Sequence, residues 1–272
     1  MKLKTFTYQS AQIFYRTIGK GKPLILIHGF AEDGDVWKNQ IEFLKDHFTV
    51  IIPDLPGTGK SDMIAGMSIL GMADVIKEIL IIELSKFALQ QAVLIGHSMG
   101  GYITLAFAEN YPTLLNAFGL VHSTAFADSE EKKLARLKSI EFIKANGAYE
   151  FLKTSIPGLF WRQDGSNSSD AYIKALTEKA KNFSSEALAQ YYQAMINRPD
   201  RTAVLKDFNG PILFIIGEHD MAVPFQQSLQ QCYLPVRSHI NILRNSAHMG
   251  MLEEAGRVNQ IFIDFVNQFL NL

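Results

Sequence analysis

Ala92-Val93-Leu94-Ile95-Gly96-His97-Ser98-Met99-Gly100 joins a short apolar run to a Gly-x-Ser-x-Gly pattern, and a helical-looking segment, residues 101–110, follows it. The order of strand, tight corner and helix holds a serine on a sharp turn, with its hydroxyl projecting from the edge of a sheet. The two glycines of the pattern remove side chains that would collide at such a corner. The stretch therefore predicts a nucleophilic serine, Ser98. The alternative is a Gly-rich connection with a buried small residue.

The composition limits the class of protein. The 272 residues, 47% of them hydrophobic, suit one large α/β domain or a core with a smaller insertion. A net charge of −1 with scattered Lys and Arg gives no footprint for nucleic acid and no polybasic cluster for a membrane surface. Cys232 is the only cysteine, which rules out a disulfide within the chain and fits a reducing compartment. Because the N-terminus has no apolar h-region and no apolar run could span a bilayer, we expect a cytoplasmic protein without stable membrane insertion. The oligomeric state stays open.

Apolar runs alternate with helical patterns along most of the chain. Residues 3–8 and 12–18 alternate polar and apolar, which predicts a β-hairpin at a sheet edge. Buried strands are then expected at 24–27, 50–52, 92–95, 115–121, 211–217 and 239–243. Helices are expected at about 36–48, 71–88, 101–110, 224–232 and 253–269. The alternation predicts a doubly wound parallel sheet. It is interrupted from about 128 to 208, where charged helical patterns and a loop at 165–169 predict a helical insertion.

A serine hydroxyl needs a base within hydrogen-bond reach, and the base needs an orienting acid. In open parallel sheets such groups lie in loops beyond the carboxyl ends of the strands. His248, between the last strand and the last helix, is the leading base, because the order serine, acid, histidine places the base late in the chain. His122 and His219 also lie near strand ends, and position alone does not exclude them.

Asp220 is the leading acid. It follows the penultimate strand and precedes His248 by 28 residues, which is enough for one helix and one strand. Glu218 is near enough to substitute for it, and Asp128 is a more distant alternative. A turn or N-cap aspartate is the non-catalytic interpretation of Asp220.

A tetrahedral oxyanion needs backbone N–H donors. Met99 supplies one at a helix N-terminus, where the helix dipole also favours negative charge. Phe30, which follows His28-Gly29, is well placed for the second.

A competing motif is Gly59-Lys60-Ser61, which follows a strand and looks like the end of a phosphate-binding P-loop. That motif requires a glycine five positions before its second glycine, and the residue there is Asp54, an anion.

The sequence also lacks a His-Glu-x-x-His pattern and has one cysteine, so we expect no metal and no cofactor.

The segments His28-Gly29-Phe30, 54–61, 96–100, 217–220 and Ser246-Ala247-His248 resemble, in this order and across nearly the whole chain, the α/β-hydrolase superfamily. The resemblance implies an α/β fold with a mostly parallel eight-stranded sheet, a core of residues 1–127 and 209–272, and a helical cap at 128–208. It implies Ser98 as nucleophile, Asp220 as acid and His248 as base. It also implies an oxyanion hole formed by the backbone N–H groups of Phe30 and Met99, and explains 56–61 as the family's turn after a strand.

Two residues narrow the class of hydrolase that the chain resembles. Ser98 stands where haloalkane dehalogenases and epoxide hydrolases use Asp, and His97 stands where carbon–carbon-bond hydrolases often carry Asn. We therefore expect a serine hydrolase that cleaves small-molecule esters of small or medium apolar acyl groups through an acyl-enzyme. Candidates for the apolar pocket are His28, Phe151, Phe160, Trp161 and Tyr192. The alternatives are a carbon–carbon-bond hydrolase or perhydrolase on the same triad, or a hydrolase-fold binding or receptor protein with little turnover.

Overall fold

A mixed sheet forms the centre of the computed structural model, which describes residues 1–86, 91–162 and 168–270. Its eight strands have the order β1-β2-β4-β3-β5-β6-β7-β8. Only β2 runs antiparallel to its neighbours, β1 and β4, and the pairs from β4 to β8 are parallel. The predicted eight-stranded, mostly parallel α/β fold is confirmed. The strands are β1 (Lys2–Tyr8), β2 (Ala11–Ile18), β3 (Pro23–Ile27), β4 (Thr49–Pro53), β5 (Ala92–His97), β6 (Leu115–Val121), β7 (Ile212–Gly217) and β8 (Ser238–Leu243).

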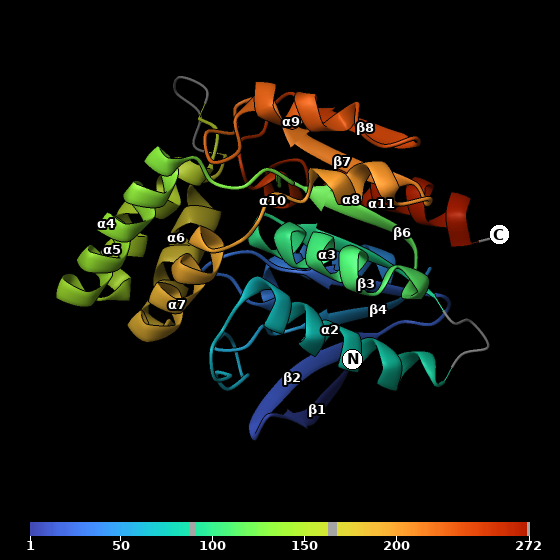
Figure 1. Cartoon of the computed structure of the whole chain (residues 1–272), viewed down its shortest axis with the longest axis horizontal. Coiled ribbons are helices and arrows are strands. Elements are labelled where there is room, and N and C mark those ends of the chain that lie inside the picture. The colour runs from blue at the N-terminus through green and yellow to red at the C-terminus, as the bar shows by residue number, and fades with distance from the viewer. Residues whose placement is uncertain (87–90, 163–167, 271–272) are drawn as a thin grey trace.

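Helices cover both faces of the sheet. Figure 1 shows α2 (Ile69–Leu84) and α3 (Met99–Asn110) in front of the sheet and α11 (Ala255–Leu270) behind it. The short helix α1 (Lys38–Leu44) packs beside α11. Because both faces are covered, every residue of β3, β5 and β7 is buried, which is why these strands read as continuous apolar runs. Further helices of this core are α8 (Thr202–Asp207), α9 (Phe225–Cys232) and α10 (Gly250–Glu253).

Four helices between β6 and β7 form a separate group, here called the insert helices: α4 (Glu130–Asn146), α5 (Ala148–Ser155), α6 (Asp170–Lys179) and α7 (Ser185–Ile196). In Figure 1 they lie together beyond one end of the sheet, on the side to which β6 and β7 point. Ser129 and Ser184 start α4 and α7, since each hydroxyl accepts a hydrogen bond from an N–H in the first turn. The insert helices therefore stand over the edge where the parallel strands end.

Element boundaries differ from the sequence predictions in a few places. The helix expected over 36–48 begins as a 3₁₀ turn, Gly34–Trp37, capped by the Asp33 side chain, and continues as α1. The helix expected over 253–269 corresponds to α11, and the separate short helix α10 precedes it and ends at Glu253. The helix expected over 71–88 runs from Ile69 to Leu84. Residues 87–88 of that prediction, and 165–167 of the predicted loop, lie outside the described residues.

Asp54 occupies the centre of the turn that resembles a P-loop. Its carboxylate accepts hydrogen bonds from the Arg16 side chain (2.8 Å) and from the backbone N–H of Lys60 (3.1 Å). The Ser61 hydroxyl donates to the carbonyl of Asp54 (2.7 Å) and accepts from the N–H of Phe14 on β2 (2.8 Å). The groups that would cradle a phosphate are thus engaged by the protein's own carboxylate, and the turn fastens the end of β4 to β2.

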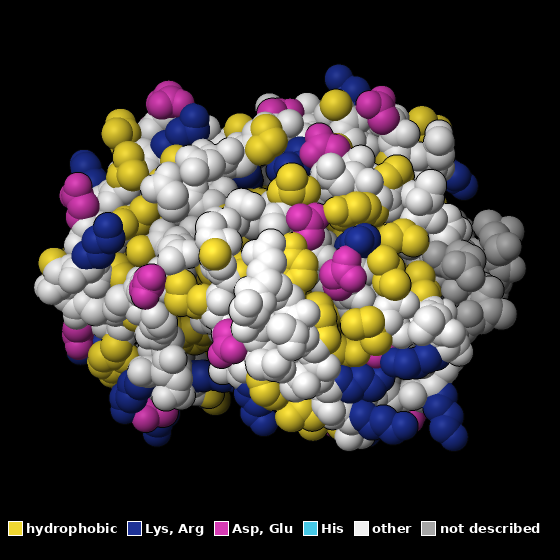
Figure 2. Space-filling model, turned by 60° about the horizontal axis from the view of Figure 1, so that its bottom comes forward, with side chains coloured by type: hydrophobic (Ala, Val, Ile, Leu, Met, Phe, Trp, Pro, Cys, Tyr) yellow, Lys and Arg dark blue, Asp and Glu magenta, His cyan; other side chains and the backbone are white. Residues whose placement is uncertain are grey.

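On the face shown in Figure 2, acidic side chains are scattered among apolar ones, and several Lys and Arg side chains gather near its lower right edge. Among the residues that the structure describes, no helix combines the length and the apolar content needed to cross a bilayer.

Gly96 and Gly100 allow β5 and α3 to meet at the corner, and this contact predicts a stability effect. A methyl group on Gly96 would collide with the carbonyl of Gly100, and one on Gly100 would collide with the carbonyl of Ile27. We expect Gly96→Ala to lower the free energy of unfolding by about 1–3 kcal/mol or more, because backbone atoms cannot yield as a flexible side chain does. Denaturant unfolding measures this difference. Gly256→Ala, at an open helical position of α11, is the control and should keep or slightly raise stability. Equal effects of the two changes would contradict the proposed collision.

Candidate active site

Ser98 lies on the corner between β5, which ends at His97, and α3, which begins at Met99. Its backbone has φ 50° and ψ −116°, a conformation that L-residues rarely adopt and that costs on the order of 1–3 kcal/mol. Hydrogen bonds on both sides hold it: the Ser98 N–H donates to the carbonyl of Val121 (2.9 Å), and the Ser123 hydroxyl donates to the carbonyl of Ser98 (2.7 Å). The neighbouring strand β6 thus stabilises the strained corner.

A continuous chain of hydrogen bonds connects Ser98, His248 and Asp220. Nε2 of His248 lies 2.9 Å from Oγ of Ser98, and Nδ1 lies 2.8 Å from Oδ2 of Asp220. Since a carboxylate only accepts, Nδ1 carries the proton, and Nε2 is left to accept the hydroxyl proton of Ser98. The backbone N–H of His248 donates to the carbonyl of Leu159 (2.9 Å), so the segment between α5 and α6 helps to position this ring. The arrangement can move a proton from Ser98 to His248.

Asp220 is held as a carboxylate from several sides. Its Oδ1 accepts the backbone N–H groups of Ala222 (2.8 Å) and Val223 (2.9 Å). Burial alone would raise the pKa of Asp220, but the charge and hydrogen bond of His248, together with the nearby ring of His122, outweigh it and hold the pKa well below its ordinary range. Asp220 therefore stays charged while it orients His248.

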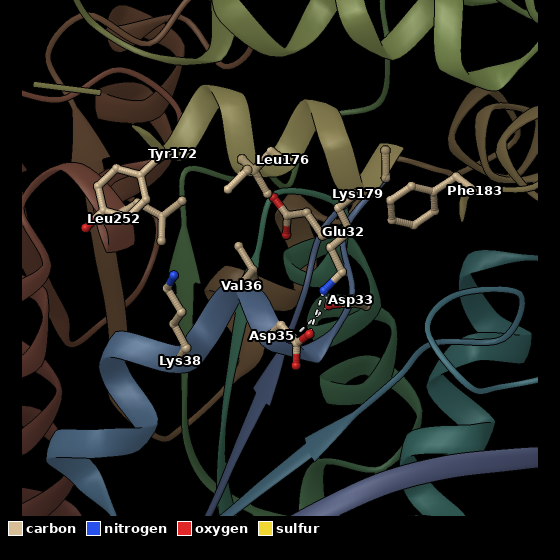
Figure 3. A pocket seen from close by; sticks show the side chains of 12 residues that line it. Glu32, Asp33, Asp35, Val36, Lys38, Tyr172, Leu176, Lys179, Phe183 and Leu252 are labelled. Atoms are coloured by element: carbon tan, nitrogen blue, oxygen red, sulfur yellow. Dashed lines mark hydrogen bonds and ion pairs between the residues drawn. The ribbon is translucent and has the colours of Figure 1, made fainter. Parts of the chain in front are cut away.

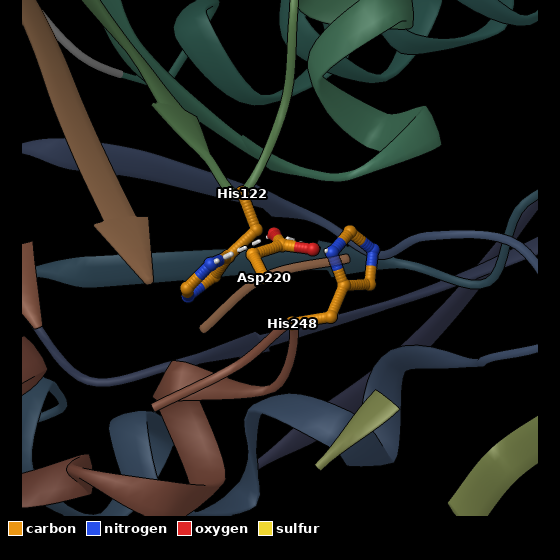
Figure 4. A group of neighbouring side chains, drawn as sticks. All are labelled: His122, Asp220 and His248. Carbon is orange, nitrogen blue, oxygen red and sulfur yellow. Dashed lines mark hydrogen bonds and ion pairs between the residues drawn. The ribbon is translucent and has the colours of Figure 1, made fainter. Parts of the chain in front are cut away.

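His122 lies on the other side of Asp220 from His248, as Figure 4 shows. The N–H of Gly250 donates to Nε2 of His122 (3.2 Å), so the proton of the neutral ring is on Nδ1, which faces Oδ2 of Asp220 at 3.4 Å. That distance is long for a hydrogen bond, so the contact is a weak one. Burial lowers the pKa of His122 to about 4, although Asp220 acts in the opposite direction, and the ring is neutral near pH 7.

The other candidate acids and bases are engaged elsewhere. The side chain of Glu218 is exposed, away from the buried ring of His248. Asp128 accepts hydrogen bonds from Arg136 (2.6 Å) and Arg198 (3.0 Å). His219 stacks on Trp161, with ring centres 4.4 Å apart. Of the two carboxylates that follow β7, only Asp220 contacts His248.

His97 and Glu32 form a buried pair behind Ser98. Nδ1 of His97 lies 3.0 Å from the Glu32 carboxylate, and Nε2 lies 2.9 Å from the carbonyl oxygen of His248. Both partners are acceptors, so the ring needs protons on both nitrogens. Burial by itself lowers the pKa of His97, but the charge and hydrogen bond of Glu32 and the His248 carbonyl outweigh it and raise the pKa. The pKa of Glu32 is lowered, because the charge and hydrogen bond of His97 outweigh burial. Sequence reasoning did not find this pair, since its members are 65 positions apart.

The two expected oxyanion donors are the backbone N–H groups of Met99 and Phe30. Met99 is the first residue of α3, and the first N–H groups of a helix have no partner within it. Phe30 lines the same cavity as Ser98 and His248. The N–H of Gly29 donates to Glu32 Oε2 (2.6 Å), which fixes the loop that carries Phe30. This geometry leaves the Phe30 and Met99 amides as candidates for binding negative charge.

A cavity of about 360 Å³ contains Ser98 and His248. Its walls come from the loop that carries Phe30 and Glu32, from the segment after Asp220 and from the insert helices, and they mix apolar side chains with charged ones. The lining residues are Phe30, Glu32, Ser98, Tyr102, Lys132, Arg136, Leu159, Tyr192, Met195, Met221, Ala222, Val223, Pro224 and His248.

Of the five side chains expected in the pocket, only Tyr192 lines this cavity. His28 is buried and binds backbone instead, with Nδ1 2.9 Å from the carbonyl of Gly29. Phe151 packs edge-on against Tyr192, with ring centres 5.8 Å apart, so it stands behind the wall. Phe160 is buried away from the cavity, and Trp161 lies against His219. The expectation for these four residues is corrected: Leu159 and two cations of α4, Lys132 and Arg136, line the cavity there.

A second cavity, of about 430 Å³, lies between α6 and the segment 31–38 (Figure 3). Lys179 of α6 reaches across it to Asp33 and Asp35, with 2.6 Å to an oxygen of each. Neither Ser98 nor His248 is among its lining residues, although Glu32 lines both cavities. The ion pairs fasten the insert helices to the core, and we assign no chemistry to this cavity.

His122, Asp220 and His248 also have the spacing of a metal site, since one potential ligand atom of each lies within 4.8 Å of the others. A metal bound there would compete with the hydrogen bond between His248 Nδ1 and Asp220 Oδ2 (2.8 Å). The same bond orients His248 toward Ser98, so the donor set fits proton transfer better than metal binding.

Comparison with known proteins finds similar chains and similar structures. Residues 22–255 match the family model described as alpha/beta hydrolase fold. The chain is 25% identical to a 2-hydroxy-6-oxononadienedioate/2-hydroxy-6-oxononatrienedioate hydrolase of Paraburkholderia phymatum, covering 94% of this chain and 91% of that protein. It is 24% identical to a putative carbamate hydrolase of Agrobacterium fabrum, covering 94% and 97%. A solved structure of a thermophilic esterase from Thermogutta terrifontis, with malate bound, superposes with a TM-score of 0.89 at 27% identity over 99% of both chains.

The pair of Glu32 and His97 predicts a pH dependence. The pKa of His97 is raised above its ordinary 6.5, so the stabilisation that it contributes is fully present below pH 6.5 and is lost as the pH rises through the folded-state pKa. The pKa of Glu32 is lowered below its ordinary 4.5, so its contribution is present above 4.5 and is lost as the pH falls through the lowered value. We expect Glu32→Gln to destabilise the protein most at pH 5–6.5 and progressively less at higher pH.

Nitrogen NMR of the imidazole ring measures the pKa of His97. Denaturant unfolding between pH 5 and 9 measures how the free energy of unfolding changes with pH. In Glu32→Gln the pKa of His97 should fall, since burial remains and the carboxylate is gone. Glu42→Gln, at an exposed carboxylate paired with Lys45, is the control and should show no such trend. A neutral His97 in the unmodified protein at pH 6 would contradict the assignment.

Proposed function

The chain belongs to the alpha/beta hydrolase fold family, and from this premise we propose that it is a serine hydrolase that cleaves carboxylic esters through an acyl-enzyme. The observation that carries the proposal is the chain of hydrogen bonds from Ser98 through His248 to Asp220, with its serine end in a cavity of about 360 Å³. A cavity of this volume suits a small molecule, which supports acyl groups of small or medium size.

In the proposed first half-reaction, Nε2 of His248 takes the proton of Ser98 as Oγ attacks the ester carbonyl carbon. The tetrahedral intermediate then collapses, the bond to the alcohol oxygen breaks, and His248 gives its proton to the departing alcohol. In the second half-reaction His248 takes a proton from water, the resulting hydroxide attacks the acyl-enzyme, and the acid leaves as Ser98 regains its proton. Asp220 stays ionised throughout and stabilises the imidazolium that forms twice in the cycle.

The backbone N–H groups of Phe30 and Met99 are proposed to stabilise the oxyanion of both intermediates. The position of Met99 at the N-terminus of α3 supports this role, because the helix dipole favours negative charge there. The insert helices are proposed to act as a cap, with residues 128–208 as its bounds. In support, α4 and α7 contribute side chains to the cavity wall, and Leu159 holds the backbone of His248.

A carbon–carbon-bond hydrolase on the same side chains is the second candidate. It is supported by the similarity to the Paraburkholderia hydrolase, whose named substrate is a dienedioate and contains no ester. Comparing kcat/KM for 4-nitrophenyl butanoate with that for this dienedioate separates the two. A clear preference for the dienedioate would replace ester hydrolysis as the proposed reaction.

The nucleophile is tested with a fluorophosphonate probe and mass spectrometry. We expect a covalent adduct on Ser98, no adduct in Ser98→Ala, and a loss of esterase kcat of at least about 10⁴-fold in that variant. Ser85→Ala, at an exposed serine after α2, is the control and should keep both adduct and activity. An adduct that persists in Ser98→Ala would contradict the mechanism, and an adduct without turnover of any ester would favour a binding protein.

The acid is tested by separate changes at the two carboxylates after β7. Asp220→Asn should lower kcat by about 10⁴-fold, because an amide can hold His248 in the wrong tautomer. Glu218→Gln should leave kcat within about twofold, since its side chain is exposed. Loss of activity only in Glu218→Gln would show that the assignment of the acid is wrong.

A further inference from the structure

Two cations on one face of α4 line the cavity that contains Ser98. They are Lys132 and Arg136, four residues apart, so their side chains lie one turn above the other on the same side of the helix. The other lining residues that the structure describes include one acidic side chain, Glu32. The lining of the cavity thus contains more cationic than acidic side chains.

Lys132 has hydrogen-bonding capacity left for a ligand. Its Nζ donates to the carbonyl of Ala222 (2.8 Å), which accounts for one of the three N–H groups of an ammonium. Within the described ranges no carboxylate forms an ion pair with it. The Lys132 charge is therefore fixed near the segment after Asp220 and is not neutralised by an acidic side chain.

Arg136 shares its counter-ion. Asp128 accepts from Nε of Arg136 (2.6 Å) and from Arg198 (3.0 Å), so these three side chains together keep one positive charge. The guanidinium of Arg136 also lies over the ring of Tyr192, 5.3 Å from its centre, which orients it at the cavity wall.

The negative groups near the cavity do not cancel this charge. Glu32 is paired with the doubly protonated ring of His97 at 3.0 Å. Asp220 is buried beneath His248 and does not line the cavity.

We propose that this cavity binds an ester that carries a free carboxylate, and that Lys132 and Arg136 hold that carboxylate while Ser98 attacks the ester. The proposal rests on the proposed ester hydrolysis and names the substrate class of the same site. A carboxylate has two oxygens, so it can accept from the ammonium and from the guanidinium at the same time. The product side of the reaction is then a dicarboxylic acid, if the charge is in the acyl group, or a hydroxy acid, if it is in the alcohol.

Matched pairs of esters test the proposal. Mono-4-nitrophenyl adipate and 4-nitrophenyl adipamate differ by a charge in the acyl group, and 4-acetoxybenzoate and 4-acetoxybenzamide differ by a charge in the alcohol. We expect kcat/KM to favour the anionic member about tenfold or more in at least one pair. The ratio should fall when salt rises from 0.05 to 0.5 M, because ions screen the attraction. The pair that shows the preference identifies the side of the ester that carries the carboxylate.

Lys132→Met should lower the ratio of kcat/KM for the anionic over the neutral ester about tenfold, the loss typical of one charge-assisted hydrogen bond. Lys132→Arg should preserve the ratio, whereas a merely structural role would change both esters alike. Lys133→Met is the matched control. Lys133 is the next residue of α4, pairs with Glu130 at 2.7 Å and does not line the cavity, so the ratio should not change. Equal rates on charged and neutral esters, or an equal loss on both in Lys132→Met, would overturn the proposal.

Binding to Ser98→Ala separates this proposal from the reaction itself. Calorimetry should show that monomethyl adipate binds about tenfold more tightly than methyl adipamate, and that Lys132→Met removes the difference. A binding preference without hydrolysis of any ester would support the carboxylate site and contradict the proposed reaction. Hydrolysis of esters without a preference for the anionic ligand would support the proposed reaction and contradict the carboxylate site.

Discussion

The buried ring of His97 has a partner at each nitrogen, the carboxylate of Glu32 at Nδ1 and the carbonyl of His248 at Nε2. A neutral imidazole donates through one nitrogen only, so with Glu32 ionised the ring makes both hydrogen bonds as the cation. Glu32 also accepts the N–H of Gly29 in the oxyanion loop. His97 thus connects the corner at Ser98 with Glu32, 65 positions away in the chain, and with the loop of His248, 151 positions away.

His97 and His122, the two histidines beside the site, differ in protonation. The backbone group that faces Nε2 of each ring accounts for the difference. His97 faces a carbonyl oxygen with its second nitrogen, so that nitrogen must carry a proton. His122 faces the N–H of Gly250 with its second nitrogen, so that nitrogen must be bare. A buried ion pair gains little net stability against well-packed apolar residues, yet removal of one partner costs about 3–5 kcal/mol. The pair of Glu32 and His97 therefore fixes the relative positions of the segments that it connects more than it raises the free energy of unfolding.

The sequence predicts most of what depends on local pattern. Continuous apolar runs become buried parallel strands, and short loops after those strands bring Ser98, Asp220 and His248 to one edge of the sheet. Sequence alone could not separate Asp220 from Glu218, which follow the same strand. The separation depends on the turn after β7, where the Asp220 carboxylate folds back onto the N–H groups of Ala222 and Val223 while Glu218 faces solvent.

The cavity wall was the least predictable part, because it depends on how each insert helix is rotated about its axis. Aromatic side chains were the natural expectation, yet Phe151 stands behind Tyr192, and Lys132 and Arg136 face the cavity. Their spacing of four residues in a helix was the available signal, since it places two cations on one face. Which way that face turns is decided by packing between elements far apart in the chain, and by the pairing of Asp128 with Arg136 and Arg198.

Glu32 both pairs with His97 and lines the cavity of Ser98. It lines the cavity of Ser98, in which an oxyanion and a substrate carboxylate are proposed to bind, and an unneutralised carboxylate there would repel both. The charge on His97 cancels that repulsion at a distance of 3.0 Å, while Glu32 keeps its second task of holding Gly29. Within the proposed mechanism, a neutral residue at position 97 would therefore change more than the packing of the corner. It would leave negative charge beside the developing oxyanion and weaken the attraction that the cations of α4 exert on an anionic substrate.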